Sequence, residues 1–152
     1  MTKNHPFKIV VAGEDFGAVL RAQALTTQLA AGLKPEFEIS NEVWKFESLD
    51  NLQMGKEAAD GAAKADMVII AGDGAAEPPT HIKSWIESWL PRKRKGLTAL
   101  FALLDHEDNA PHESSPLYAY LRRTARKWGM KFLTNSADGW QRNFGFPAEA
   151  SA

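Results

Sequence analysis

The sequence contains no cysteine. It therefore excludes disulfides, iron–sulfur clusters, thiol redox chemistry and zinc sites built from cysteine. It also lacks an uninterrupted apolar run of the roughly 20 residues that span a bilayer, and its first six residues lead into an apolar segment without the pattern of a secretory signal. These absences predict a soluble cytoplasmic protein with no membrane partner.

A strong charge of either sign is also missing. The 18 basic and 19 acidic residues give a formal net charge of −1, and the isoelectric point is near 6.4. No global field would attract nucleic acid, and the basic run Arg92–Lys95 is short. We therefore expect no nucleic-acid partner, and we interpret Arg92–Lys95 as a solvated loop.

What the chain does have is enough apolar sequence for one core. Its 152 residues are 44% hydrophobic, which predicts a single domain over residues 1–152. From about residue 135 onward, glycine and proline interrupt the sequence and no helical period is visible, so an irregular tail is expected. The tail contains three aromatic residues, Trp140, Phe144 and Phe146. We predict that they pack on the sheet of the same chain; the alternative is that they dock against a second copy.

Five short segments have the character of strands. Four are almost continuously apolar, which is typical of strands buried on both faces of a parallel sheet. These four are Phe7–Ala12, Met67–Ala71, Leu97–Leu104 and Lys131–Leu133. The fifth, Phe37–Phe46, is more polar and suits an edge position.

Helical patterns fill the intervals between these strands. They cover about Ala18–Ala31, Asn51–Ala65 and Thr80–Leu90, and a fourth begins with Ser115 as cap and ends at Gly129. Strands that alternate with helices predict an α/β fold with a parallel sheet and right-handed crossovers. No helix is expected after the last strand, so one face of the sheet would be a helix short.

The segment from Ala65 to Leu90, ADMVIIAGDGAAEPPTHIKSWIESWL, resembles the corresponding stretch of flavodoxin-like proteins, especially the NADPH-dependent FMN reductases. That family has an Ala-Asp pair before a buried strand, a loop that ends in proline, and a helix with an early lysine and aromatic residues. The matching positions are Ala65–Asp66, Met67–Ala71, Pro78–Pro79, Lys83 and Trp85. The resemblance implies a flavodoxin-like three-layer sandwich with strand order 2-1-3-4-5, FMN as cofactor, and NAD(P)H oxidoreductase activity of the flavin or quinone reductase type.

In that topology a ligand lies above the carboxyl ends of the first and third strands, where the strand order reverses. Loops 13–17, 72–79 and 105–115 border this crevice. The candidate cofactor-binding residues come from the first two loops and are Gly13, Glu14, Asp15, Phe16, Gly17, Gly72, Asp73 and Gly74. No catalytic residue is assigned.

The first loop departs from the family because it has two carboxylates where the family has hydroxyl groups. Two anions about 4 Å apart repel by about 4 kcal/mol in a surface-like dielectric, so Glu14 and Asp15 disfavour the FMN phosphate. The middle loop lacks an aromatic residue for the flavin ring, which leaves Trp140 or Phe144 as stacking candidates. We therefore predict a degenerate cofactor site.

For the acidic pair itself we favour a structural interpretation. Asp15, at the N-cap of the first helix or close to it, would accept hydrogen bonds from the amides of Gly17 or Ala18. A carboxylate of the chain would then lie where a phosphate lies in relatives. A catalytic or metal-binding role of the pair is the alternative.

Two further features of the sequence point to other roles. Response-regulator receiver domains resemble this chain in strand order and in an acidic pair matching Glu14 and Asp15, but their phosphoacceptor position falls on Ala71. That alternative is a degenerate regulatory domain. No metal is predicted, because no diagnostic spacing is present; the weak candidates are Asp105, His106, Asp108 and His112.

These observations favour a binding or regulatory role without catalysis. The expected partner is another protein or a second copy of this chain, as a homodimer. An FMN-dependent NAD(P)H oxidoreductase remains the alternative.

Overall fold

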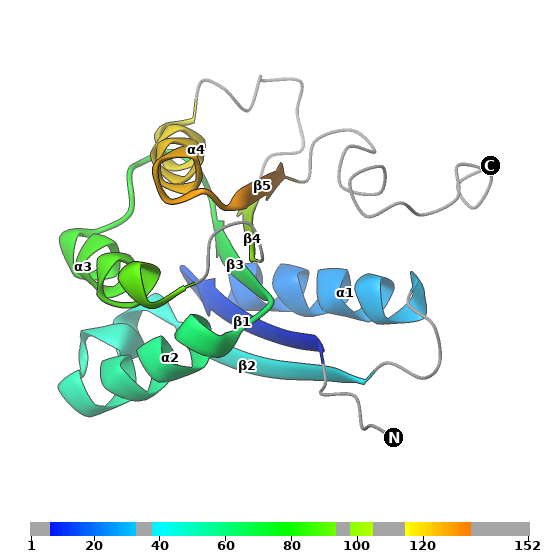
Figure 1. The fold of residues 1–152 in the computed structure, drawn as a ribbon. Helices are drawn as coiled ribbons and strands as arrows, with labels where there is room; N and C mark the ends of the chain where they lie inside the picture. Colours follow the sequence, from blue (N-terminus) through cyan, green and yellow to red (C-terminus); the bar gives the residue numbers. More distant parts are fainter. Residues whose placement is uncertain (1–6, 33–37, 94–97, 105–114, 135–152) are drawn as a thin grey trace.

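Five parallel strands form one sheet in the computed structural model, which describes residues 7–32, 38–93, 98–104 and 115–134. The strands are β1 (Phe7–Gly13), β2 (Ile39–Lys45), β3 (Met67–Gly72), β4 (Ala99–Leu104) and β5 (Lys131–Thr134). Their spatial order is β2-β1-β3-β4-β5 (Figure 1). The predicted flavodoxin-like α/β arrangement, with strand order 2-1-3-4-5, is confirmed.

The burial of the strands explains why their sequences differ. Every residue of β3 and β4 is buried, and both strands pair with a neighbouring strand on each side. Among the described strands, β2 pairs only with β1, and it is half-buried along most of its length. The polar composition of β2 is therefore that of an edge strand, as predicted.

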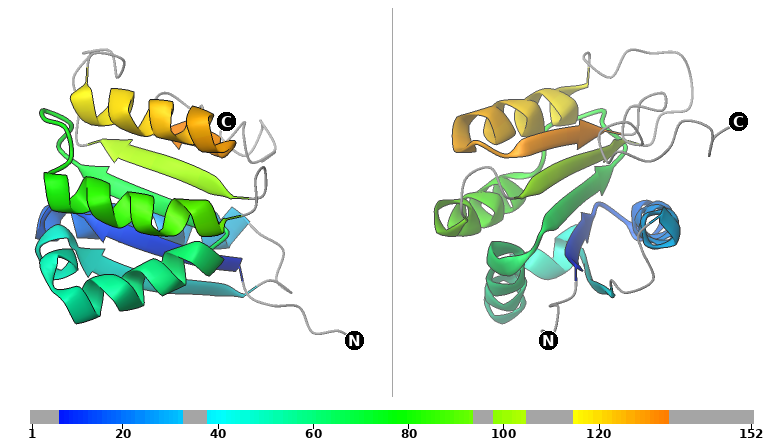
Figure 2. Two further views of the ribbon diagram at one scale, coloured as in Figure 1. Left: turned by 60° about the vertical axis from the view of Figure 1, so that its left-hand side comes forward. Right: turned by 45° about the vertical axis from the view of Figure 1, so that its right-hand side comes forward.

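The helices lie in two layers of unequal size. They are α1 (Phe16–Gly32), α2 (Leu52–Lys64), α3 (Thr80–Trp89) and α4 (Pro116–Trp128), with two short 3-10 helices, η1 (Phe46–Asp50) and η2 (Leu90–Arg92). The layer of α2, α3 and α4 covers one face of the sheet, and α1 lies on the other face (Figure 2). Alternate strand residues divide between the two layers: Val10 and Val68 pack toward α2–α4, whereas Val11 and Ile69 pack toward α1.

Helix ends follow the local signals in the sequence. Asn51 caps α2 by accepting a 2.9 Å hydrogen bond from the Met54 amide. The Ser115 hydroxyl accepts a 3.1 Å bond from the Tyr118 amide at the start of α4, and Gly129 ends that helix in the left-handed region, with φ of 71°.

Some boundaries differ from the prediction. The α1 helix begins at Phe16, two residues before the predicted start, because Asp15 already caps it. Phe46, predicted to end the second strand, starts η1 and is buried in the core. Leu90, predicted to end the third helix, starts η2. The expected tail from residue 135, its aromatic residues and the expected lack of a final helix lie outside the described residues.

Candidate functional site

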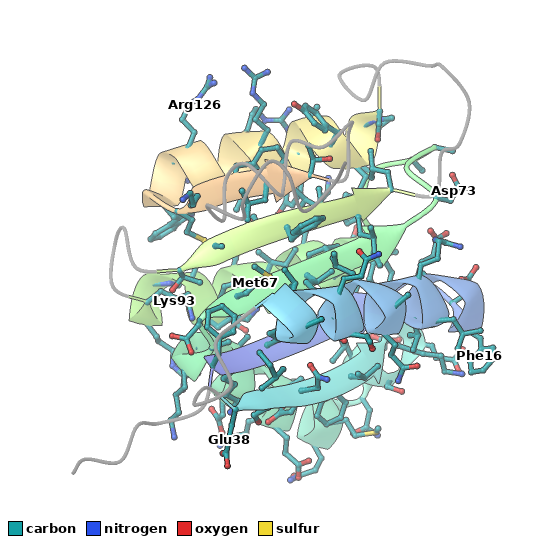
Figure 3. The ribbon with its side chains drawn as sticks, turned by 90° about the vertical axis from the view of Figure 1, so that its right-hand side faces the viewer. Phe16, Glu38, Met67, Asp73, Lys93 and Arg126 are labelled. Atoms are coloured by element: carbon teal, nitrogen blue, oxygen red, sulfur yellow. The ribbon has the colours of Figure 1, made fainter. Side chains whose placement is uncertain are left out.

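The candidate residues of the first two loops lie together at one edge of the sheet. Gly13 ends β1 beside Ala71, and the Glu14 amide donates a 2.9 Å hydrogen bond to the Ala71 carbonyl. Figure 3 shows Phe16 and Asp73 at this edge and Lys93 at the opposite one. A cavity of about 280 Å³ opens here; its lining residues are Glu14, Phe46, Asp73, Ala75, Ala76, Glu77, Pro78, Pro79 and Leu117.

Asp15 is the N-cap of α1. Its Oδ1 accepts a 2.9 Å hydrogen bond from the Ala18 amide, and its carbonyl accepts a 3.0 Å bond from the Val19 amide. The predicted N-cap bond of Asp15 is therefore confirmed, with Ala18 as the donor. The negative charge also lies at the positive end of the helix dipole, where it is stabilised.

Glu14 joins the first loop to the second. Its Oε1 accepts a 2.9 Å hydrogen bond from the Asp73 amide, 59 residues away in the chain. Gly72 makes room for this contact, because a Cβ atom there would lie 2.8 Å from Glu14 Oε1 and 3.3 Å from Leu117 Cδ2. The sequence did not reveal this bond, since no local pattern links a glutamate to an amide so far away.

The loop after β3 is fixed by two further hydrogen bonds. Asp73 Oδ1 accepts a 3.0 Å bond from the Ala75 amide, which closes an Asx turn. Gly74 has a φ of 88°, and its carbonyl accepts a 2.8 Å bond from the buried Ser115 hydroxyl. Ser115 thus caps α4 and also ties that helix to the loop; only the first role was predicted.

Lys83, the early lysine of the family resemblance, forms an ion pair with Glu77 at the cavity rim. The hydrogen bond and the positive charge of Lys83 lower the pKa of the Glu77 carboxyl. Lys83 Nζ also lies 5.2 Å from the centroid of the Tyr120 ring, and burial raises the pKa of that phenol. The Lys83 ammonium therefore interacts both with the Glu77 carboxylate and with the Tyr120 ring.

The remaining candidate residues of the first loop do not line the cavity. Gly13 allows β1 to approach α1, since a Cβ there would lie 2.8 Å from Val19 Cγ2. Phe16 is 65% exposed at the first position of α1 and does not line the cavity. Gly17 follows it in the same helical turn.

The crevice residues that the structure describes do not fit FMN. The amides of Ala18 and Asp73 already bind carboxylates of the chain, and the cavity rim carries Glu14, Asp73 and Glu77. A phosphate dianion would have to displace these acceptors and tolerate their charge. Phe46, the aromatic residue of the lining, is only 6% exposed and offers no open ring face for stacking.

The metal candidates of the third loop, Asp105, His106, Asp108 and His112, lie outside the described residues. Within the described part of the chain, no group of three or more His, Asp or Glu side chains could hold a metal ion. His81 Nε2 lies 2.9 Å from the Phe46 carbonyl. Because a carbonyl only accepts, this nitrogen carries the proton, and His81 anchors η1 to α3.

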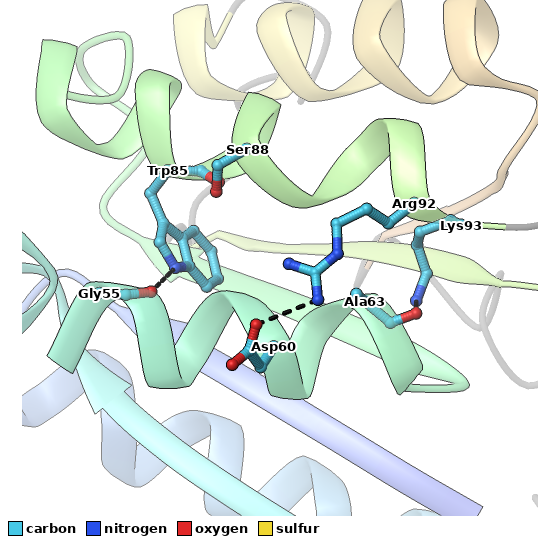
Figure 4. Close-up of polar contacts among 7 residues, drawn as sticks. All are labelled: Gly55, Asp60, Ala63, Trp85, Ser88, Arg92 and Lys93. Atoms are coloured by element: carbon cyan, nitrogen blue, oxygen red, sulfur yellow. Dashed lines mark hydrogen bonds and ion pairs between the residues drawn. The ribbon is translucent and has the colours of Figure 1, made fainter. Parts of the chain in front are cut away.

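A larger cavity, of about 810 Å³, lies between α2 and α3, and sequence reasoning missed it. Its lining residues are Leu49, Asp50, Asn51, Leu52, Gly55, Lys56, Ala59, Asp60, Thr80, His81, Ser84, Trp85, Ser88 and Arg92. Polar groups of its lining join α2 to α3 and to η2. The Trp85 indole donates a 3.1 Å bond to the Gly55 carbonyl, and Arg92 pairs with Asp60 at 3.0 Å (Figure 4).

Lys93 binds the backbone at the C-terminal end of α2. Its Nζ donates hydrogen bonds of 2.5, 3.1 and 2.9 Å to the carbonyls of Ala62, Ala63 and Ala65, and burial lowers its pKa to about 8. The interpretation of Arg92–Lys95 as a solvated loop is therefore wrong for Lys93, which is half-buried and holds the end of α2. Arg92 lies in η2 and remains exposed, although it pairs with Asp60. Residues 94 and 95 lie outside the described part of the chain.

Among the described segments, no helix combines the length and apolar character needed to cross a membrane. Comparison of the chain with models of protein families, with curated proteins and with solved structures finds no match.

Proposed function

We propose that this flavodoxin-like protein has a binding or regulatory role through protein contacts and that its cofactor site is degenerate. One observation carries the proposal: the crevice supplies its own anions. Asp15 binds the Ala18 amide and Glu14 binds the Asp73 amide, each at 2.9 Å. In a phosphate-binding loop, amides of this kind face the ligand.

The surface of α1 supports contacts with another protein chain. Its solvent-facing stripe has a helical period and contains no charged residue. This uncharged face of α1 consists of Phe16, Leu20, Gln23, Ala24, Thr27, Gln28 and Ala31. Phe16 and Leu20, one turn apart, are 65% and 49% exposed. Two copies can bring such faces together without opposing like charges, so we include homodimerisation through α1 in the proposal.

A titration of FMN with the purified protein tests the degenerate site. We expect no saturable quenching of FMN fluorescence by the wild type. The variant Glu14→Ser/Asp15→Ser removes both carboxylates and introduces hydroxyl groups that resemble those of the FMN-binding loop. Quenching that appears only in this variant would show that the carboxylates are the barrier. Saturable quenching by the wild type would contradict the proposal and favour an FMN-dependent NAD(P)H oxidoreductase.

A further inference from the structure

The solvent-facing side of α4 carries positive charge only. Its exposed residues include Arg122, Arg123, Arg126 and Lys127, and the helix contains no Asp or Glu. We call these residues the basic face of α4. The opposite side of the helix is buried in the core through Leu117, Leu121 and Ala125. This arrangement keeps the basic face at the surface, and Figure 3 shows Arg126 projecting away from the sheet.

Within the described part of the chain, no ion pair joins the basic face to an acidic residue, although the charge of Arg123 acts on the Glu77 carboxylate. The ion pairs found there join other cations, such as Lys83 with Glu77 and Arg92 with Asp60. Lys127 Nζ lies 5.7 Å from the centroid of the neighbouring Trp128 ring, which leaves its charge in place. The α2 helix differs, because acidic residues alternate with its lysines and Asp60 binds Arg92.

The helix dipole stabilises only two of the four cations of the basic face. Arg126 and Lys127 lie in the last turn of α4, where positive charge is stabilised by the helix dipole. Arg122 and Arg123 lie in the middle of the helix and gain nothing from it. They stand one turn before Arg126 and Lys127, so each forms a like-charge pair at the i, i+4 spacing, which destabilises a helix. Such an arrangement is expected where an external anion compensates the charge.

The spacing of the arginines matches carboxylates on a short segment. Residues four apart on a helix lie about 6 Å apart along its axis, which is also the spacing of acidic residues on a facing helix. A guanidinium binds a carboxylate through two parallel hydrogen bonds, so arginine suits this role better than lysine. The basic face therefore has the chemistry and the spacing to hold several carboxylates at once.

Two other polyanions fit less well. The basic face extends only about 8 Å along the helix, too short for the many phosphates that nucleic-acid binding requires. At the opposite edge of the sheet, Glu14, Asp15 and Asp73 would repel a long polyanion. A membrane surface would need an apolar helix face to insert, but Leu121 and Ala125 are buried in the protein core.

We propose that the basic face of α4 is a docking surface for an acidic, Asp- and Glu-rich segment of a partner protein. None of the four residues of the basic face lines the crevice cavity, and the proposal holds whether or not the crevice binds FMN. It gives the protein contacts of the preceding section a chemical specificity.

The test uses the full chain and a fluorescein-labelled glutamate homopeptide, whose binding is followed by fluorescence anisotropy at low ionic strength. We expect saturable binding that weakens about tenfold in Arg122→Gln/Arg126→Gln, as two exposed charge pairs are lost. Glutamine keeps the helix propensity of arginine, and the melting temperature checks the fold. The matched control, Lys56→Gln/Lys64→Gln, removes two exposed charges from α2 and should bind like the wild type.

Three outcomes would overturn the proposal. The first is no binding of the peptide by the wild type, and the second is an equal loss of affinity in the α4 and α2 variants. The third is stronger binding of a DNA oligonucleotide or of phosphatidylserine vesicles than of the peptide, at equal charge concentration. That result would assign the basic face to a nucleic acid or a lipid surface.

Discussion

Glu14 and Asp15 are neighbours with the same charge, yet they bind amides on different elements. Asp15 accepts from the helix that it starts, whereas Glu14 accepts from the loop after β3. Each bond places a carboxylate where it satisfies a backbone donor, and together they hold two loops of the crevice in place. Because both amides are already bound within the chain, an external anion gains little at this edge.

Replacement of Asp15 by alanine should destabilise the protein. The Ala18 amide would lose its acceptor, and loss of an N-cap carboxylate costs about 1 kcal/mol. Urea unfolding followed by circular dichroism measures this change. Asp15→Ser retains an acceptor at the cap and should lie within a few tenths of a kcal/mol of the wild type. Equal stability of Asp15→Ala and the wild type would contradict the role of Asp15 as a cap.

The difference between Asp15 and Glu14 shows what sequence reasoning could reach. The Asp15 bond spans three residues and follows the general preference of helix starts, so it was predictable. The Glu14 bond spans 59 residues and depends on Gly72, whose missing side chain leaves space for the carboxylate. It becomes visible only when β1 and β3 are placed side by side.

At the scale of elements, periodicity predicted the strands and the helices, because burial on one or two faces sets the spacing of apolar residues in the sequence. The order of the strands was implied by the resemblance to flavodoxin-like proteins. Contacts between α2 and its neighbouring elements could not be predicted from this spacing. The two glycines of α2 weaken its helical pattern, but in the structure they are points of close approach. Gly55 faces the Leu49 carbonyl, and Gly61 faces the Glu42 carboxylate.

These two glycines should respond differently to alanine. In an exposed helix the change would stabilise by about 1 kcal/mol. At Gly55 a Cβ would lie 2.9 Å from the Leu49 carbonyl oxygen, and backbone yields little, so we expect Gly55→Ala to destabilise by about 1–3 kcal/mol. The Trp85 bond to the Gly55 carbonyl would be disturbed as well.

At Gly61 the close atom is Glu42 Oε1, at 2.6 Å, the end of a flexible side chain. The carboxylate can turn away, at the expense of its contacts with Lys8 and Trp44, each 3.4 Å long. We therefore expect Gly61→Ala to lie within about 1 kcal/mol of the wild type. Thermal unfolding of both variants measures the contrast, and a larger loss at Gly61 than at Gly55 would refute this explanation.

At the scale of the whole molecule, the net charge of −1 conceals separate regions of unlike character. The crevice edge is acidic, one face of α4 is basic, and the solvent face of α1 is uncharged. Composition alone could not show this, because a sum over the chain carries no positions. The basic face of α4 became visible only when the helix showed which of its residues are buried and which are exposed.

This separation predicts opposite responses to salt for the two proposed contacts. A contact through the uncharged face of α1 depends on apolar burial, so the dimer should persist at high ionic strength. Binding of the glutamate peptide at α4 should weaken, because salt screens the charges. Sedimentation velocity over a range of protein concentrations measures the dimer.

The variant Phe16→Lys/Leu20→Lys should abolish the dimer by opposing like charges. The matched control is Leu52→Lys, at a 91% exposed position on α2. A dimer that dissociates with added salt, or that survives the α1 substitutions, would place the self-association surface elsewhere.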